Sequence, residues 1–344
     1  MTLRRTGLAF VMAIALEGLL GGLLAWPQEA TAPNSLRGPA PLGLDLAVPL
    51  PPENEPNPTK VELGRRLFFD AALSRDDSMA CATCHDPVRY FTNGQPRGTG
   101  VGGQQGRRNV PSVLNVGYGR AFFWDGRAPS LEDQVLLPIQ NPAELDLTLE
   151  ELELRLEANE EYRIAFLDSF EDGKASAANA ARALASYLRT LRAGDAPIDR
   201  HLAGDTNALG EAALRGMRVF TGQGNCSECH PFPLFTDHRL HNTGVSYGAG
   251  DAGRYAVTGQ EADRGRFKTP SLRNVAQTAP YMHDGSLASL EEVVEHYDSG
   301  GAHNPHLDPQ ITPLGLTDTQ KADLIAFLQA LTSCTVNEIP IIAC

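Results

Sequence analysis

Apolar residues recur at helical spacing along most of the chain, and no run shows the strict alternation that is typical of strands. Residues 59–70 place Leu63 and Leu67 on one face of a predicted helix. Residues 147–170 and 175–193 have the pattern of two long amphipathic helices. The pattern therefore predicts a mainly α-helical fold.

Residues that cap helices mark several helix starts. Ser130 and Ser289 each precede a helical pattern and have an acidic residue three positions later. Thr317 and Gln320 have the spacing of a capping box, which predicts the start of the last helix.

The chain contains an internal repeat. Residues 111–135 align without a gap with residues 270–294, and ten of the 25 positions are identical. Two related domains in tandem explain the repeat, and we place them at residues 59–204 and 205–344.

Each predicted domain carries one C-x-x-C-H segment, at residues 81–85 and 226–230. This is the attachment signature of a c-type haem, in which the two thiols form thioethers and the histidine binds the iron. A redox dithiol or half of a zinc site are the alternatives for a single copy, and two copies favour haem. We therefore predict two covalently bound c-type haems in two cytochrome c-like domains. The attaching and ligating residues are Cys81, Cys84 and His85 in the first domain and Cys226, Cys229 and His230 in the second.

The N-terminal residues have the pattern of an export signal. Arg4 and Arg5 precede a mostly apolar stretch, which Glu17 interrupts, and small residues follow it. We predict a signal peptide over residues 1–32, with retention as a membrane anchor as the alternative. Export places the mature protein in the periplasm. Residues 33–58 are rich in proline and predict a tether or an arm that wraps the surface.

Charge and the two other cysteines add little chemistry. The net charge of −13 argues against a nucleic-acid partner. In an oxidising compartment we expect Cys334 and Cys344 to form a disulfide, with two free thiols as the alternative.

The second axial position of each haem decides the function. No histidine lies between residues 86 and 200, so the first domain offers no obvious second ligand for its iron. We predict an open or water-bound iron, and the alternative is a ligand from the second domain. The second haem has six candidate ligands downstream of its motif: Met282, His283, His296, Tyr297, His303 and His306.

From about residue 59 to 332 the chain resembles the bacterial di-haem cytochrome c peroxidase and MauG superfamily. The resemblance rests on the two haem motifs and on four further segments. These are residues 108–112 (RNVPS), 123–128 (FWDGRA), 141–144 (NPAE) and 278–281 (TAPY).

The resemblance implies roles for individual residues. Trp124 would lie between the haems and relay electrons. Glu144 would be the acid on the distal side of the first haem, with Gln134 and Pro138 lining the pocket. Without the resemblance, Trp124 would be read as a core aromatic residue and Glu144 as a surface acid.

The resemblance also implies a calcium site and a branch of the superfamily. Asn109 and the main-chain oxygens of Thr278 and Pro280 would bind one Ca²⁺ between the domains. Val101 stands where conventional members carry a histidine that closes the peroxidatic haem, and Tyr297 stands where they carry a methionine ligand. Both departures are typical of the MauG-like branch, and they imply an open first haem and a second haem with a tyrosine ligand.

The function so implied is that of a periplasmic di-haem peroxidase. Hydrogen peroxide would react at the open haem, form high-valent iron and oxidise a partner protein. One alternative is a conventional cytochrome c peroxidase that removes peroxide with electrons from a soluble cytochrome or copper protein. Another is an electron carrier or redox sensor without turnover, which would gain nothing from an open iron.

Overall fold

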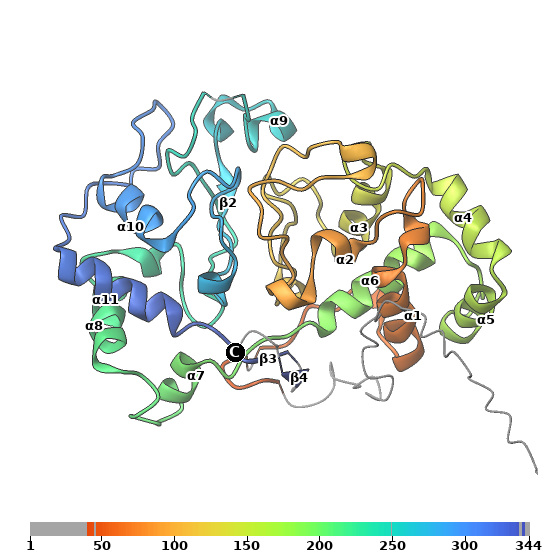
Figure 1. The fold of residues 1–344 in the computed structure, drawn as a ribbon, viewed down its shortest axis with the longest axis horizontal. Coiled ribbons are helices and arrows are strands. Elements are labelled where there is room, and N and C mark those ends of the chain that lie inside the picture. The colour runs from red at the N-terminus through yellow and green to blue at the C-terminus, as the bar shows by residue number, and fades with distance from the viewer. Residues whose placement is uncertain (1–39, 45, 249, 337–338, 341–344) are drawn as a thin grey trace, which may run out of the picture. The chain divides into compact units, whose positions relative to one another are not determined.

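The computed structural model describes residues 40–336 and 339–340, except residues 45 and 249. The predicted signal peptide and Cys344 lie outside the described residues, whereas Cys334 is disulfide-bonded. Helices dominate the described part, as predicted (Figure 1). The helices are α1 (Pro58–Phe69), α2 (Cys81–Cys84), α3 (Leu131–Gln140), α4 (Leu149–Ala158), α5 (Glu160–Ser169), α6 (Ala177–Thr190), α7 (Pro197–Leu202), α8 (Glu211–Thr221), α9 (Tyr255–Thr258), α10 (Leu290–Asp298) and α11 (Asp318–Gln329). The strands β1 (Leu240–His241) and β2 (Phe267–Lys268) pair antiparallel, as do β3 (Thr335–Val336) and β4 (Ile339–Pro340).

Each half of the chain is built on two helices that touch at a glycine. A Cβ added to Gly64 of α1 would lie 1.9 Å from the main-chain oxygen of Ala183 in α6. A Cβ added to Gly216 of α8 would lie 1.9 Å from the main-chain oxygen of Asp323 in α11. Any other residue would clash at these contacts, so glycine permits the close approach. The internal repeat is therefore present in the structure as one helix pair used twice, with α1 and α8 each preceding a haem segment.

Two hydrophobic clusters form the cores of the two halves. The first includes Leu67 of α1 and Leu184 of α6, which are fully buried. The second is centred on Phe220, Phe235 and Phe327, whose ring centroids are 5.0 to 6.4 Å apart. Cys81 and Cys84 pack against the first cluster and Cys226 against the second, so each core supports one haem segment.

The same turn follows the haem segment in both halves. The Phe122–Ala128 and Tyr281–Leu287 bridges are isolated antiparallel pairs that close equivalent turns. Trp124 and His283 take equivalent places inside them. The turns lead into α3 and α10, whose first N–H groups are capped by serine side chains, as predicted.

The described part of the Pro-rich arm is bound to both halves. Leu44 is fully buried, and the amide of Asn54 donates to the carboxylate of Glu132 in α3 at 2.7 Å. Arg273 of the second half donates to the main-chain oxygen of Gly43 at 3.0 Å. These contacts favour the wrapping arm over the free tether.

The prediction of one helix over residues 147–170 is wrong. Asn159 has an extended backbone (φ −94°, ψ 114°), which ends α4, and its side chain accepts hydrogen bonds from the first N–H groups of α5. The break is hidden in the sequence because both helices carry apolar residues at helical spacing. Among the described residues, no helix is long and apolar enough to cross a membrane.

Candidate functional site

The first haem segment is a single helical turn. Cys81 and Cys84 are the first and last residues of α2, and His85 follows directly. The Nδ1 of His85 lies 3.1 Å from the main-chain oxygen of Phe91. Because a carbonyl can only accept, Nδ1 carries the proton and Nε2 is left with a lone pair. Burial lowers the pKa of His85, so the ring is neutral, as an iron ligand must be.

The second segment repeats this arrangement. Asn225, in the left-handed region at φ 51°, leads into the 3₁₀ turn Cys226–Glu228. The Nδ1 of His230 lies 2.8 Å from the main-chain oxygen of Phe235, and burial lowers the pKa of His230 to about 4. All four motif cysteines are free thiols, as thioether formation requires. Both segments therefore fit a covalently bound haem.

A mainly apolar cavity adjoins the second segment. Its walls include Cys226, Cys229 and His230 from the motif, together with Trp124 and Tyr297. A haem is a large, mostly apolar ring, and the cavity offers matching walls. The apolar residues that line it include Phe220, Leu272, Val275, Leu290, Val294 and Leu328.

The cavity reduces the set of candidate ligands for the second haem. Met282, His283 and Tyr297 line it, whereas the other three histidines do not. His296 is held elsewhere, with its Nε2 2.9 Å from the main-chain oxygen of Thr243. Burial raises the pKa of Tyr297 to about 12. Tyr297 as the iron ligand stays a prediction among three residues.

Glu144 lies near the first haem segment. Burial raises the pKa of the Cys81 and Cys84 thiols, and the charge of Glu144 adds a smaller contribution to both rises. The amide nitrogen of Asn141 donates to Glu144 Oε1 at 2.6 Å, while the amide oxygen of Asn141 accepts from the Ala143 N–H at 3.0 Å. The second bond fixes which end of the amide faces the acid.

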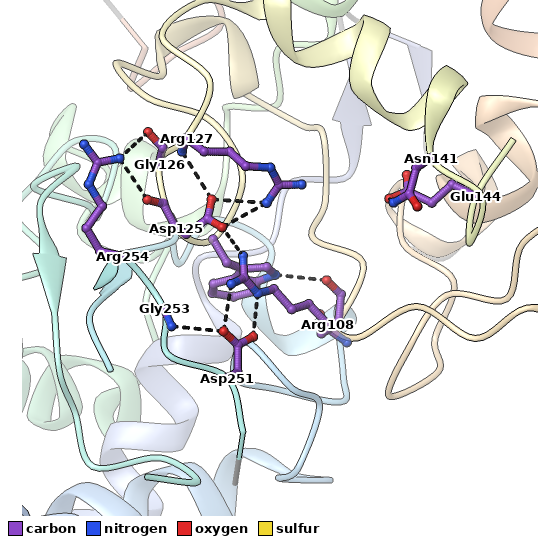
Figure 2. A network of polar contacts seen from close by, with 11 residues as sticks. Arg108, Asp125, Gly126, Arg127, Asn141, Glu144, Asp251, Gly253 and Arg254 are labelled. Atoms are coloured by element: carbon purple, nitrogen blue, oxygen red, sulfur yellow. Dashed lines mark hydrogen bonds and ion pairs between the residues drawn. The ribbon is translucent and has the colours of Figure 1, made fainter. Parts of the chain in front are cut away.

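Two opposing effects act on the carboxyl of Glu144. Burial raises its pKa, and the bond from Asn141 and the charge of Arg127 oppose this rise. In Figure 2 the Arg127 side chain extends toward the side on which Asn141 and Glu144 lie. A carboxyl held in this way can accept and return a proton.

The Gly-rich loop of residues 93–106 packs against the segment that carries Glu144. The buried Val101 donates its N–H to the main-chain oxygen of Glu144 at 2.9 Å. A Cβ on Gly100 would lie 2.3 Å from the main-chain oxygen of Ala143. Val101 is thus fixed beside the predicted acid.

Gln134 and Pro138 lie one turn apart on α3 and share a face of that helix. The main-chain oxygen of Pro138 accepts the N–H groups of Asn141 at 3.3 Å and of Leu145 at 3.2 Å. The helix end that carries Pro138 thereby anchors the segment that carries Glu144. Whether Gln134 and Pro138 line the substrate pocket stays a prediction.

Trp124 is bonded to both halves of the chain. Its indole Nε1 donates to the main-chain oxygen of Asn109 at 2.9 Å, and its own main-chain oxygen accepts from the N–H of Lys268 at 2.7 Å. It also lines the cavity of the second segment. The structure therefore brings Trp124 together with the second haem site.

Two of the predicted calcium ligands, Asn109 and Pro280, lie together in the structure. The side-chain amide of Asn109 faces three carbonyl oxygens, those of Gln95 (3.2 Å), Pro280 (3.3 Å) and Pro96 (3.5 Å). The side-chain hydroxyl of Thr278 donates to the main-chain oxygen of Val275. The main-chain oxygen of Thr278 as a calcium ligand stays a prediction. An amide turned over would present its oxygen beside these carbonyls, and such an all-oxygen set suits Ca²⁺.

An ionic network next to Trp124 was missed by the sequence reasoning. Arg108 binds the carboxylates of Asp125 and Asp251, and Arg254 binds the main-chain oxygens of Asp125 and Gly126 (Figure 2). Arg108 and Asp125 lie in the family segments 108–112 and 123–128, but nothing in the sequence pairs either residue with Asp251.

Comparison with known proteins gives consistent results over most of the chain. A family model described as di-haem cytochrome c peroxidase matches residues 58–207. The methylamine utilization protein MauG of Methylorubrum extorquens is 42% identical over 288 residues, which cover 83% of this chain and 81% of that protein. The cytochrome c551 peroxidase of Pseudomonas aeruginosa is 37% identical over 283 residues, which cover 78% of each chain.

Solved structures have the same fold. The crystal structure of a MauG-like protein associated with microbial copper homeostasis superimposes with a TM-score of 0.77 at 33% identity, and covers 90% of this chain and 96% of that one. The diheme peroxidase BthA from Burkholderia thailandensis gives a TM-score of 0.70 at 26% identity, with 81% and 87% covered. The two haem segments, in which the Nε2 of His85 and of His230 keeps a lone pair, agree with this similarity, and together they show the family. The chain belongs to the di-haem cytochrome c peroxidase and MauG family of haem-dependent oxidoreductases.

Proposed function

We propose that this enzyme is a periplasmic peroxidase of the MauG-like type, which reduces hydrogen peroxide at the His85 haem and oxidises a partner protein. The observation that carries the proposal is the partly buried carboxyl of Glu144, which Asn141 holds near the first haem segment. When bound, the haem supplies the iron at which the O–O bond of peroxide is reduced. Val101, which has no ligating atom, supports access of peroxide to that iron.

The residues of the chain supply proton transfer. Peroxide reduction consumes two electrons and two protons and yields two molecules of water. The carboxylate of Glu144 accepts the proton of one peroxide oxygen and returns it to the other, which then leaves as water. Asn141 keeps the carboxylate aimed during both transfers.

The electrons come from the second half of the chain. We propose that Trp124, bonded to both halves, would relay them from the second haem site, where His230 would hold the haem and Tyr297 would supply a second ligand. The partner protein is the source of these electrons and is thereby oxidised. The conventional alternative, a soluble cytochrome or copper-protein donor, predicts fast turnover with a reduced donor of that class.

The proposal is tested by replacing Glu144 with Gln. This variant keeps the size and polarity of the side chain but cannot accept the proton. The reaction with hydrogen peroxide, followed by stopped-flow haem absorbance, should slow by about 10²–10⁴-fold. Glu150→Gln, on the exposed side of α4, is the matched control and should react at the wild-type rate. An equal rate in Glu144→Gln and wild type would remove Glu144 from the mechanism.

A further inference from the structure

Arg108 joins the two halves of the chain next to Trp124. Its Nη1 donates to Asp125 at 2.7 Å, while its Nε and Nη2 donate to the two oxygens of Asp251 at 2.7 and 2.8 Å. Its side chain is only 18% exposed. Asp125 belongs to the first half and Asp251 to the second, so one guanidinium is shared by a carboxylate from each (Figure 2).

Both carboxylates are themselves fixed. Asp125 is 6% exposed and also binds Arg127 at 3.0 Å. Asp251 accepts the N–H of Gly253 at 3.0 Å. Burial favours the neutral form of Asp251, but the bonds from Arg108 and Gly253 outweigh it and lower its pKa to about 2. Asp251 is therefore ionised at neutral pH, and its two bonds to Arg108 do not vary with protonation there.

Asn109 follows Arg108, and Trp124 precedes Asp125; these two neighbours are hydrogen-bonded to each other through the indole. Asn109 accepts the hydrogen bond of Trp124 Nε1 at 2.9 Å, and its own N–H donates to the main-chain oxygen of His283 at 2.8 Å. Two adjacent pairs of residues are therefore linked: Arg108 binds Asp125, and Asn109 binds Trp124. Arg108 is the member of this set that binds side chains of both halves.

We propose that Arg108 is a positioning residue for electron transfer between the two haem sites: by tying Asp125 to Asp251, it fixes the indole of Trp124 against the cavity of the second haem. This role rests on the proposed function of Trp124 as the relay. Each electron that passes from the second haem site toward the first is consumed by peroxide and replaced by the partner protein. Arg108 itself is neither oxidised nor protonated.

The test measures communication between the haems in the holoenzyme. Peroxide is mixed with resting enzyme, and two rates are recorded: the reaction at the first haem and the following oxidation of the second. Arg108→Gln should leave the first rate unchanged and slow the second at least tenfold, because a misplacement of about 1 Å can cost about 10²-fold. Arg108→Lys keeps the positive charge but loses the two-pronged guanidinium geometry, so its second rate should lie between those of Arg108→Gln and the wild type.

The matched control is Arg215→Gln. Arg215 binds both oxygens of Asp323 at 2.8 Å, with the same two-pronged geometry but within one half of the chain. It should keep both rates, which separates the proposed role from the general loss of an ion pair. Asp251→Asn tests the bridge from its other end, and Arg108→Gln combined with Asp251→Asn should be no slower than Arg108→Gln alone.

The outcomes separate the two proposals. If peroxide leaves the second haem of the wild type unchanged, the proposed function and the positioning role both fail. If the wild type responds, Trp124→Phe is slow and Arg108→Gln keeps the wild-type rate, only the positioning role fails. If Arg108→Gln does not fold, Arg108→Lys and Asp251→Asn give the same decision, and wild-type rates in both would overturn the role.

Discussion

The indole Nε1 of Trp124 donates a hydrogen bond to the main-chain oxygen of Asn109 at 2.9 Å. Asn109 in turn donates its N–H to His283, the residue that occupies the place of Trp124 in the second copy of the repeat. The duplicated turns of the two halves are therefore joined through one residue. At this equivalent position of the repeat, the first half has the indole of Trp124 and the second half has the imidazole of His283.

Asn141→Ala should shift the pH dependence of the peroxide reaction. Loss of the 2.6 Å bond to Glu144 removes one of the two effects that oppose burial, so the pKa of Glu144 should rise further. The unprotonated carboxylate is the form that accepts a proton, so the rate falls as the pH falls through this pKa. The acid limb of a rate–pH profile should therefore move to higher pH.

The control for this prediction is Asn207→Ala, at an exposed position of the second half. It should reproduce the wild-type profile. An acid limb at the same pH in Asn141→Ala and wild type would contradict the role of Asn141.

Tyr297→Phe should change the spectrum of one haem and leave the other as it is. The substitution removes only the hydroxyl from a side chain that lines the cavity of the second segment. Optical and paramagnetic resonance spectra of the variant check this, with Tyr247→Phe, at a partly exposed position, as the control. Unchanged spectra in Tyr297→Phe would leave Met282 and His283 as the ligands to examine.

Calcium should be present at one ion per chain and should depend on Asn109. The three carbonyl oxygens that face its amide give the site its ligands once the amide oxygen joins them. A chelator should lower the melting temperature of the wild type by removing the bound ion, and should not affect Asn109→Ala. Metal analysis that finds no calcium in the wild-type enzyme would contradict the site.

Asp199→Asn should destabilise the fold strongly. The side chains of Asp199 and Arg273 are 2% and 1% exposed and form two bonds of 2.8 Å. Removing one charge leaves a buried guanidinium without its partner, which costs about 3–5 kcal/mol. Denaturant unfolding measures the loss, with the exposed Asp205→Asn as control. A loss below about 1 kcal/mol, typical of a surface pair, would show that the bridge contributes little.

Local signals in the sequence predicted much of the fold. The starts of α3, α10 and α11 were found because Ser130, Ser289 and Thr317 each accept a hydrogen bond from an N–H in the first turn, which is a local interaction. The break at Asn159 was missed because asparagine can cap a helix or sit in one, and the apolar spacing continued on both sides.

The site was predicted less completely because its contacts are distant in sequence. The haem segments are local motifs, and the duplicated spacing identified them without structural information. The pairing of Arg108 with Asp251 spans 143 residues, and no pattern around residue 251 marks it. The contact of Asn141 with Glu144 is local, and it was missed for another reason: the sequence does not show that the Ala143 N–H binds the amide oxygen and so turns the amide nitrogen toward the acid.

We propose that the two haem sites have different roles, with an open first haem and a second haem that has two protein ligands. Low-temperature paramagnetic resonance of the resting enzyme, before and after hydrogen peroxide, tests this directly. One high-spin and one low-spin ferric signal at rest, both lost when peroxide is added, is the predicted result. Two low-spin signals at rest, or a low-spin signal that peroxide does not change, would contradict it.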